Sequence, residues 1–314
     1  MKNEMKPTLL VSVALLMALP LQAKGQNYLE RAQIDTTVRL DRGGSVDLSL
    51  ISGRIRVTGW DRSDVKVSAT IDRGTLRFSA TSARVSLTVD DNDDDGRNRR
   101  HHNVGDARYE VSVPRGTRLI LEAVSGDVTA SGSQGEIEAS SVSGDVDVTN
   151  GVRDVTAESV SGSVHAAQIN GDLNAQSVSG DVRVETVSGA VEASTVSGNI
   201  RLVGVQSKDV RSETVSGNIG YSGSIDAGGR YDFESHSGTV RLNIPRGSGA
   251  TFNVETFSGD IQADFPVTVQ SGGTRGRRGG RMEFTIGDGK ARVTAQTFSG
   301  SIVINSGSDS TTRR

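Results

Sequence analysis

Residues 178–200 read VSGDVRVETVSGAVEASTVSGNI, and this stretch decides the fold. A Ser-Gly step occurs at Ser179-Gly180, again at Ser188-Gly189 and again at Ser197-Gly198, so the pattern returns every nine residues. A valine precedes each Ser-Gly step. The second residue after the glycine is again apolar, as in Val-Ser-Gly-Asp-Val at residues 178–182. The same nine-residue grid holds earlier glycines, and an arginine stands in the glycine's place once: Gly126, Gly135, Gly144, Arg153, Gly162 and Gly171.

An odd repeat length requires the chain to turn within each repeat. Side chains alternate between the two faces of a strand, so Val182 and Val184 share one face. Nine residues cannot continue that alternation, and Val187 would fall on the wrong face unless the chain turns a corner before Ser188. Glycine accepts the positive φ that such a corner often needs. The repeat therefore predicts one short strand and one corner, with Gly189 supplying the turn.

One such strand has no partner within its own repeat, so the repeats above and below it must satisfy its hydrogen bonds and cover its valines. Two repeats make a coil of 18 residues, and the later glycine spacings of 19 and 21 residues fit the same coil. We expect an all-β, single-domain β-solenoid, similar to a parallel β-helix, with coils of roughly 18–21 residues over residues 36–305. Val182, Val184, Val191 and Ile200 should be buried inside it. A β-propeller is the alternative, but its blades need about 40–45 residues each.

The N-terminal segment predicts export. Residues 1–23 combine Lys2 and Lys6, an apolar run over 9–19 that is too short to span a bilayer, and a small residue, Ala23, at a cleavage position. This is typical of a Sec-type signal peptide, and it predicts a protein of the periplasm, the cell surface or the medium. The chain has no cysteine, which excludes disulfides and thiolate metal sites. We expect residues 24–35 to form a linker, residues 306–314 to form a disordered tail, and no transmembrane segment to follow the signal peptide.

Several stretches carry a resemblance to a known family. They are residues 124–128, 142–146 and 178–182, together with the opening stretch 53–61 and the closing stretch 287–302. The chain resembles the bacterial "putative adhesin" family known as domain of unknown function 4097, over about residues 36–305. The resemblance implies a β-strand repeat fold and a role in adhesion or at the cell envelope, including envelope-stress signalling, which involves some members.

An acidic run within an expected loop over residues 90–107 is a candidate calcium site. Asp91, Asp93, Asp95 and Gly96 match the start of a calcium loop, in which alternating carboxylates converge on one cation. The twelfth position of that loop is His102 instead of the usual glutamate. The alternative is a charge-rich loop between two strands. Calcium is the only cofactor that the sequence leaves open.

A basic loop over residues 271–281 is a candidate contact for anionic polymers. It carries its arginines among glycines, at Arg275, Arg277, Arg278 and Arg281. Such a segment could bind an anionic envelope polymer, and the alternative is a flexible insertion. Export argues against nucleic acid as a partner.

If the coils stack in register, several of the acidic or amide residues that follow the repeat glycines should form a ladder on one outer edge. They are Asp127, Asp145, Asp172, Asp181, Asn199, Asn218 and Asp260. The ladder would be either solvated or relieved of its charge repulsion by cations and arginines.

Two functions remain open on the sequence. The first is an exported, non-enzymatic adhesin or binding and scaffolding module for cell-surface or envelope polymers or proteins. The second is a carbohydrate-active enzyme on a β-helix, resembling a polysaccharide lyase or hydrolase. None of the four histidines falls in a triad or in metal-ligand spacing. The coils between Gly126 and Gly217 are the most regular part of the chain and lack the irregular loops in which such enzymes concentrate their acidic and basic residues. The sequence therefore favours the binding module and predicts no catalytic residue.

Overall fold

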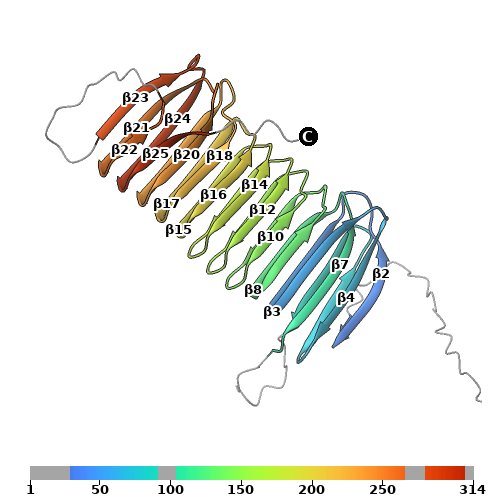
Figure 1. Cartoon of the computed structure of the whole chain (residues 1–314). Coiled ribbons are helices and arrows are strands. Elements are labelled where there is room, and N and C mark those ends of the chain that lie inside the picture. Colours follow the sequence, from blue (N-terminus) through green and yellow to red (C-terminus); the bar gives the residue numbers. More distant parts are fainter. Residues whose placement is uncertain (1–28, 91–103, 266–279, 308–314) are drawn as a thin grey trace, which may run out of the picture.

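The fold is an all-β solenoid. The computed structural model describes residues 29–90, 104–265 and 280–307, and every helix or strand in these ranges is a β-strand. Figure 1 shows the strands lying across the long axis of a rod, with β2 and β4 toward one end and β21 to β23 toward the other. The predicted fold class is confirmed.

Each central coil has two parallel strands, one on each of two faces of the rod. The strands of the first face are β9 (Ile137–Ser141), β11 (Val155–Ser159), β13 (Leu173–Ser177), β15 (Val191–Ser197), β17 (Asp209–Ser216) and β19 (Arg230–Ser237). Those of the second face are β10 (Val146–Thr149), β12 (Val164–Ile169), β14 (Val182–Val187), β16 (Ile200–Val205), β18 (Ile219–Gly223) and β20 (Val240–Pro245). Strands of one face pair in register, as β12 with β14 and β13 with β15. Identical positions of successive coils therefore lie in straight columns along the rod.

The N-terminal end combines long strands with antiparallel ones. Its strands are β1 (Leu29–Arg31), β2 (Gln33–Arg39), β3 (Ser45–Trp60), β4 (Asp64–Ile71), β5 (Thr75–Ala80), β6 (Arg84–Asp90), β7 (Ala107–Pro114) and β8 (Arg118–Ser131). Both β3 and β8 run through a corner and contribute to both faces, and they pair in parallel along their length. Antiparallel β4 and β2 extend the second face beyond β7, and β5 and β1 extend the first face beyond β6. Residues 29–35, expected as part of a linker, thus belong largely to strands.

At the C-terminal end the order of coils in space differs from their order in sequence. The strands are β21 (Ala250–Ser258), β22 (Ile261–Ala263), β23 (Gly280–Ile286), β24 (Ala291–Ser299) and β25 (Ile302–Gly307). The last coil, β24 with β25, lies between the coil of β19 and β20 and the coil of β21 and β22. Antiparallel β23 then pairs with β21 at the end of the first face. Arg281, expected in the basic loop, is an exposed residue of β23.

The core is a thin layer of inward side chains. Val182, Val184, Val191 and Ile200 are all buried, as predicted. Valine and alanine fill the middle coils because opposite faces of a flattened coil lie close together. Larger rings fill the later coils, where Tyr221 and Phe233 lie 5.1 Å apart between centroids.

The chain turns at two corners with different chemistry. The Ser-Gly corner joins the first face to the second, as at residues 178–181. The return corner joins the second face to the first, and a column of positive φ angles runs along it, at Gly132, Asn150, Gln168, Thr186 and Gly204. The sequence interpretation placed positive φ at the repeat glycines, and for the central ones this was wrong: Gly144, Gly162, Gly180, Gly189 and Gly198 are absent from the residues with positive φ.

The corner glycines are required by close contact between coils. A Cβ built on Gly162 would overlap the carbonyl oxygen of Gly144, and one on Gly180 would overlap that of Gly162. The same overlap recurs at Gly198 and Gly217. Gly220, in the middle of β18, has open space instead, with its nearest atom, the Ile200 carbonyl oxygen, 3.9 Å away.

Replacing a corner glycine should therefore destabilise the protein where a mid-strand glycine tolerates the same change. We expect Gly162→Ala to lower the free energy of unfolding by about 1 to 3 kcal/mol, since backbone must move to admit the methyl group. Gly220→Ala is the matched control, and it should leave the free energy of unfolding unchanged or slightly raised. Equal losses for the two variants in urea denaturation would contradict the close-contact account.

Candidate functional site: the Ser-Gly corner

A ladder of buried hydroxyl groups lies on the inner side of the Ser-Gly corner. In each coil, a serine or threonine two residues before the corner serine donates a hydrogen bond of 2.8–3.2 Å to the corner glycine carbonyl of the neighbouring coil. The donors are Ser141, Ser159, Ser177, Thr195, Thr214, Ser235, Thr256 and Thr297. Ser177 also accepts the amide hydrogen of Gly180, at 2.9 Å. The ladder satisfies backbone groups that the corner would otherwise leave unpaired in the interior.

The predicted Asp and Asn ladder lies beside it on the outer side, with a structural role. The Asp181 carboxylate accepts the backbone N–H of Asn199 at 2.8 Å, and Asn199 in turn accepts that of Asn218 at 3.1 Å. Because Ser163 stands between Asp145 and Asp181 in this column, the carboxylates do not form an unbroken row. Asp172, one of the candidates for this ladder, lies instead at the return corner, where it accepts the N–H of Ala190.

The outward side of the corner carries a column of exposed side chains that are apolar except for His236, and we call this column the corner ladder. It comprises Val124, Val142, Val160, Val178, Val196, Val215, His236, Phe298 and Phe257, in spatial order. Its valines are 44 to 49% exposed. Large apolar side chains in one exposed, contiguous row are unusual on a soluble protein and mark an interaction surface.

The ladder ends in stacked rings. The ring centroids of His236 and Phe298 lie 4.9 Å apart, and those of Phe298 and Phe257 lie 4.7 Å apart, all nearly parallel. Their separation equals the spacing of neighbouring strands, about 4.7–4.9 Å. Stacked in this way, the rings present their edges outward, and Phe257 is 63% exposed. The last coils therefore widen the apolar row.

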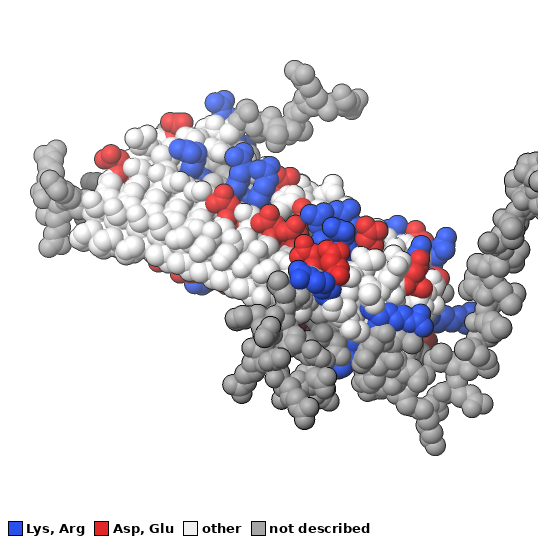
Figure 2. All heavy atoms as spheres, turned by 90° about the horizontal axis from the view of Figure 1, so that it is seen from below, with Lys and Arg blue, Asp and Glu red and all other residues white. Residues whose placement is uncertain are grey.

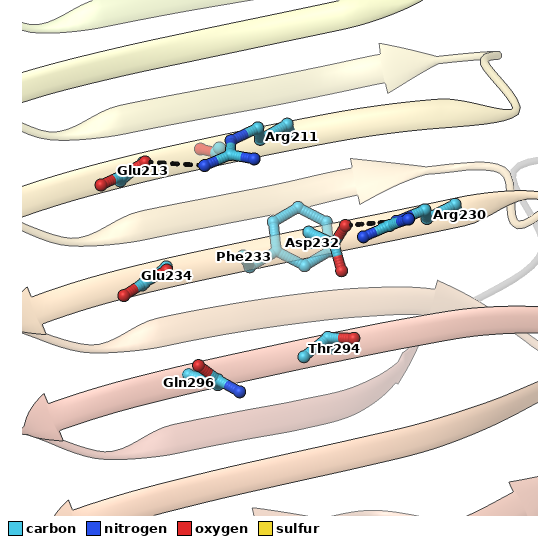
Figure 3. A pocket seen from close by; sticks show the side chains of 9 residues that line it. Arg211, Glu213, Arg230, Asp232, Phe233, Glu234, Thr294 and Gln296 are labelled. Atoms are coloured by element: carbon cyan, nitrogen blue, oxygen red, sulfur yellow. Dashed lines mark hydrogen bonds and ion pairs between the residues drawn. The ribbon is translucent and has the colours of Figure 1, made fainter.

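Charges are distributed unevenly over the rod. Figure 2 shows acidic and basic side chains gathered in a band beside a broad surface without charged side chains. On the first face, Arg211 pairs with Glu213 at 3.4 Å and Arg230 with Asp232 at 2.7 Å, and together they border a shallow hollow of about 270 Å³ (Figure 3). The hydrogen bond with Asp232 raises the pKa of Arg230. The arginines here are neutralised by neighbours on their own strands.

The clearest pKa shifts belong to core tyrosines. Burial raises the pKa of Tyr109 and of Tyr221 far above the usual range. Both hydroxyl groups donate to backbone carbonyls, Tyr109 to Ser49 at 3.2 Å and Tyr221 to Ser224 at 2.6 Å. These tyrosines lie inside the coils and serve packing.

The residues proposed from sequence as binding sites fall mostly outside the described ranges. Asp91, Asp93 and Asp95 of the calcium loop lie outside them, as do Arg275, Arg277 and Arg278 of the basic loop. Arg281 lies opposite Glu255 in the pairing of β21 with β23. Among the residues the structure does describe, no three His, Asp or Glu side chains are grouped to hold a metal ion.

The corner ladder was missed by the sequence interpretation, although its signal was present. The valine before each Ser-Gly step was treated as part of the strand. The alternation of faces turns this valine outward where the first face passes to the second, whereas Val187, before Ser188-Gly189 at the return corner, is buried. Counting forward from buried Ser177, the next side chain, Val178, must face solvent.

Comparison with known proteins identifies the family. The profile of the Toastrack DUF4097 family matches residues 45–305 of this chain. The chain belongs to this family. A search of curated proteins finds no match. No helix within the described ranges is long and apolar enough to cross a membrane.

Three solved structures match this Toastrack protein at low sequence identity and with TM-scores below 0.5. A "putative lipid binding protein" from Parabacteroides distasonis is 14% identical, with a TM-score of 0.42 over 90% of this chain and 96% of that one. A "putative adhesin" from Bacteroides fragilis is 12% identical, with a TM-score of 0.34 over 89% and 98%. A "putative cell adhesion protein" from Clostridium sporogenes is 10% identical, with a TM-score of 0.22 over 87% and 99%. These values carry no function over to this chain.

Removing one hydroxyl of the buried ladder should destabilise the protein. Ser177→Ala leaves the carbonyl of Gly162 and the amide of Gly180 without their partner, so we expect the free energy of unfolding to fall by about 1 to 3 kcal/mol. Ser179→Ala, in the same coil but exposed, is the matched control and should change it by less than about 0.5 kcal/mol. If thermal and urea denaturation gave the same small change for both, the hydroxyl ladder would not stabilise the corner.

Proposed function

We propose that this Toastrack protein is an exported, non-enzymatic binding or scaffolding module of the cell envelope, and that the corner ladder is its contact surface. The observation that carries the proposal is the exposed apolar row itself. It continues from Val124 to Phe257 across every central coil, although a solvated corner has no need of valine at that position. Export is proposed from the signal-like segment over residues 1–23.

The geometry of the ladder supports recognition of an extended partner. Its side chains repeat at the strand spacing of about 4.8 Å, so they offer many equivalent contacts along one line. Each contact covers a small apolar area and is weak, and strength comes from several made together. An envelope polymer or an extended protein segment has the shape to make them.

The alternative of a carbohydrate-active enzyme would place its chemistry on the first face. The hollow in Figure 3 holds the carboxylates of Glu213, Asp232 and Glu234. Glu213 and Asp232 are both ion-paired, and the hollow is open to solvent. A catalytic acid needs a site that excludes water and perturbs its pKa. The ion-paired and solvent-exposed charges of this face therefore agree better with a binding module than with a carbohydrate-active enzyme.

Binding should weaken when the ladder loses apolar surface. In the double variant Val178→Ser with Val196→Ser, we expect the affinity for the bound component of an array of peptidoglycan, lipopolysaccharide and teichoic acid to fall about three- to tenfold. Val152→Ser is the matched control, because Val152 is 44% exposed but lies at the return corner.

Two results would argue against this function. The first is equal binding by the ladder variant and by Val152→Ser. The second is turnover of any of the polymers that Glu234→Gln abolishes, which would favour the enzyme.

Export predicts a defined N-terminus. Protein recovered from cells should begin after Ala23, because signal peptidase removes such segments. Mass spectrometry of the intact protein measures this directly. Recovery of a chain that retains residues 9–19 in the cytoplasmic fraction would contradict export.

A further inference from the structure

The second face contains a group of arginines that differ from those of the first face. Three consecutive coils place Arg201, Gly220 and Arg241 in one outward column, in register. Both arginines are exposed. Neither has a hydrogen bond or ion pair with any described residue. This contrasts with Arg183, one coil earlier in the same column, which pairs with Glu185.

Gly220 leaves a gap between the two arginines. A strand spacing of about 4.8 Å puts the backbones of Arg201 and Arg241 about 10 Å apart. Since glycine has no side chain, the surface between them forms a hollow of about 320 Å³. Gly220 of β18 lies between the two arginine positions, and Arg201 and Arg241 both line the hollow.

No carboxylate borders this hollow. The residues that line it include Arg201 and Arg241 and otherwise only uncharged residues. On the corner side, the Asp181 position of earlier coils becomes Asn199, Asn218 and then Thr239. On the other side, the Glu185 position becomes Val203, Ser222 and then Asn243. Acidic residues therefore disappear from both flanking columns at the coils where the unpaired arginines occur.

We infer that this hollow, the Arg201–Gly220–Arg241 notch, binds a phosphate group. Guanidinium groups form two parallel charge-assisted hydrogen bonds with phosphate, of about 2.7–2.9 Å. Two of them on opposite sides of an anion-sized gap can hold one phosphate from both sides. Ser222 and Asn243 offer further hydroxyl and amide donors at its edge. A neutral polymer or an acidic protein segment with separate carboxylates would use this two-sided arrangement less completely.

The notch lies on the second face, away from the row of corner-ladder side chains, so it adds a site to the proposed function without depending on it. Phosphate groups of an envelope occur both in phosphodiester polymers and in lipid head groups. The chemistry at the notch is the same for both sources, and the experiment separates them.

The test measures binding of the purified protein to poly(glycerol phosphate), to phosphatidylglycerol vesicles and to phosphatidylcholine vesicles as the zwitterionic reference. We expect binding to at least one of the two anionic probes, weakening as ionic strength rises. Arg201→Gln and Arg241→Gln should each reduce the affinity about tenfold. Gly220→Thr, which fills the gap without displacing backbone, should reduce it similarly while leaving the melting temperature unchanged.

Arg211→Gln on the first face is the matched control, since it removes one exposed arginine whose charge Glu213 already balances. It should leave the affinity within about twofold of the wild type. Binding to poly(glycerol phosphate) would identify a phosphodiester polymer as the source of the phosphate. Binding to phosphatidylglycerol vesicles would identify a lipid head group as the source. The inference is overturned if neither anionic probe binds, or if Arg201→Gln, Arg241→Gln and Gly220→Thr bind as the Arg211→Gln control does. Loss of binding in the ladder variants alone would therefore also overturn the notch and would assign the contact to the corner.

Discussion

The hydrogen bond from a buried serine or threonine to the corner glycine of the neighbouring coil is the interaction on which the rest of the rod depends. Ser177 can reach the Gly162 carbonyl because Gly180, in the same coil as Ser177, has no Cβ that would overlap this carbonyl oxygen. The close approach of neighbouring coils at the glycines and the hydrogen bond from the buried hydroxyl group therefore depend on each other. They fix where each coil turns, and a strand that turns at the same residue in every coil is necessarily in register. Register in turn aligns the outward valines into a ladder.

Much of the fold could be predicted from the sequence because the repeat length and the alternation of faces are both local. They led to the two-strand coil and to the burial of Val182. The order of the C-terminal coils could not be predicted, since the insertion of β24 and β25 beside β20 depends on which coils fit together in space. The role of the corner glycines was misread because positive φ and close approach select the same residue type. The corner ladder escaped notice because a valine inside a repeat is usually a core residue.

The two outward surfaces derived from the fold differ in chemistry because they occupy different columns of the same coil. The corner column is apolar at every central coil except that of β19, where it carries His236, so it suits an extended partner that makes many small contacts. The Arg201 column changes from coil to coil, and a charged hollow arises only where Gly220 interrupts it. The same regular backbone thus carries the corner ladder, which repeats along the rod, and the notch, which occurs at one place. The fold is the same at both.

Amide hydrogen exchange at the Ser-Gly corner tests the central claim most directly. The amides of Gly162 and Gly180 donate to the hydroxyl groups of Ser159 and Ser177, both at 2.9 Å. If these bonds hold the corner, both amides should exchange as slowly as that of Val182, which lies within the strand pairing. Exchange of the two glycine amides at the rate of an exposed loop, with Val182 still protected, would show that the strands alone hold the rod together and would contradict the account.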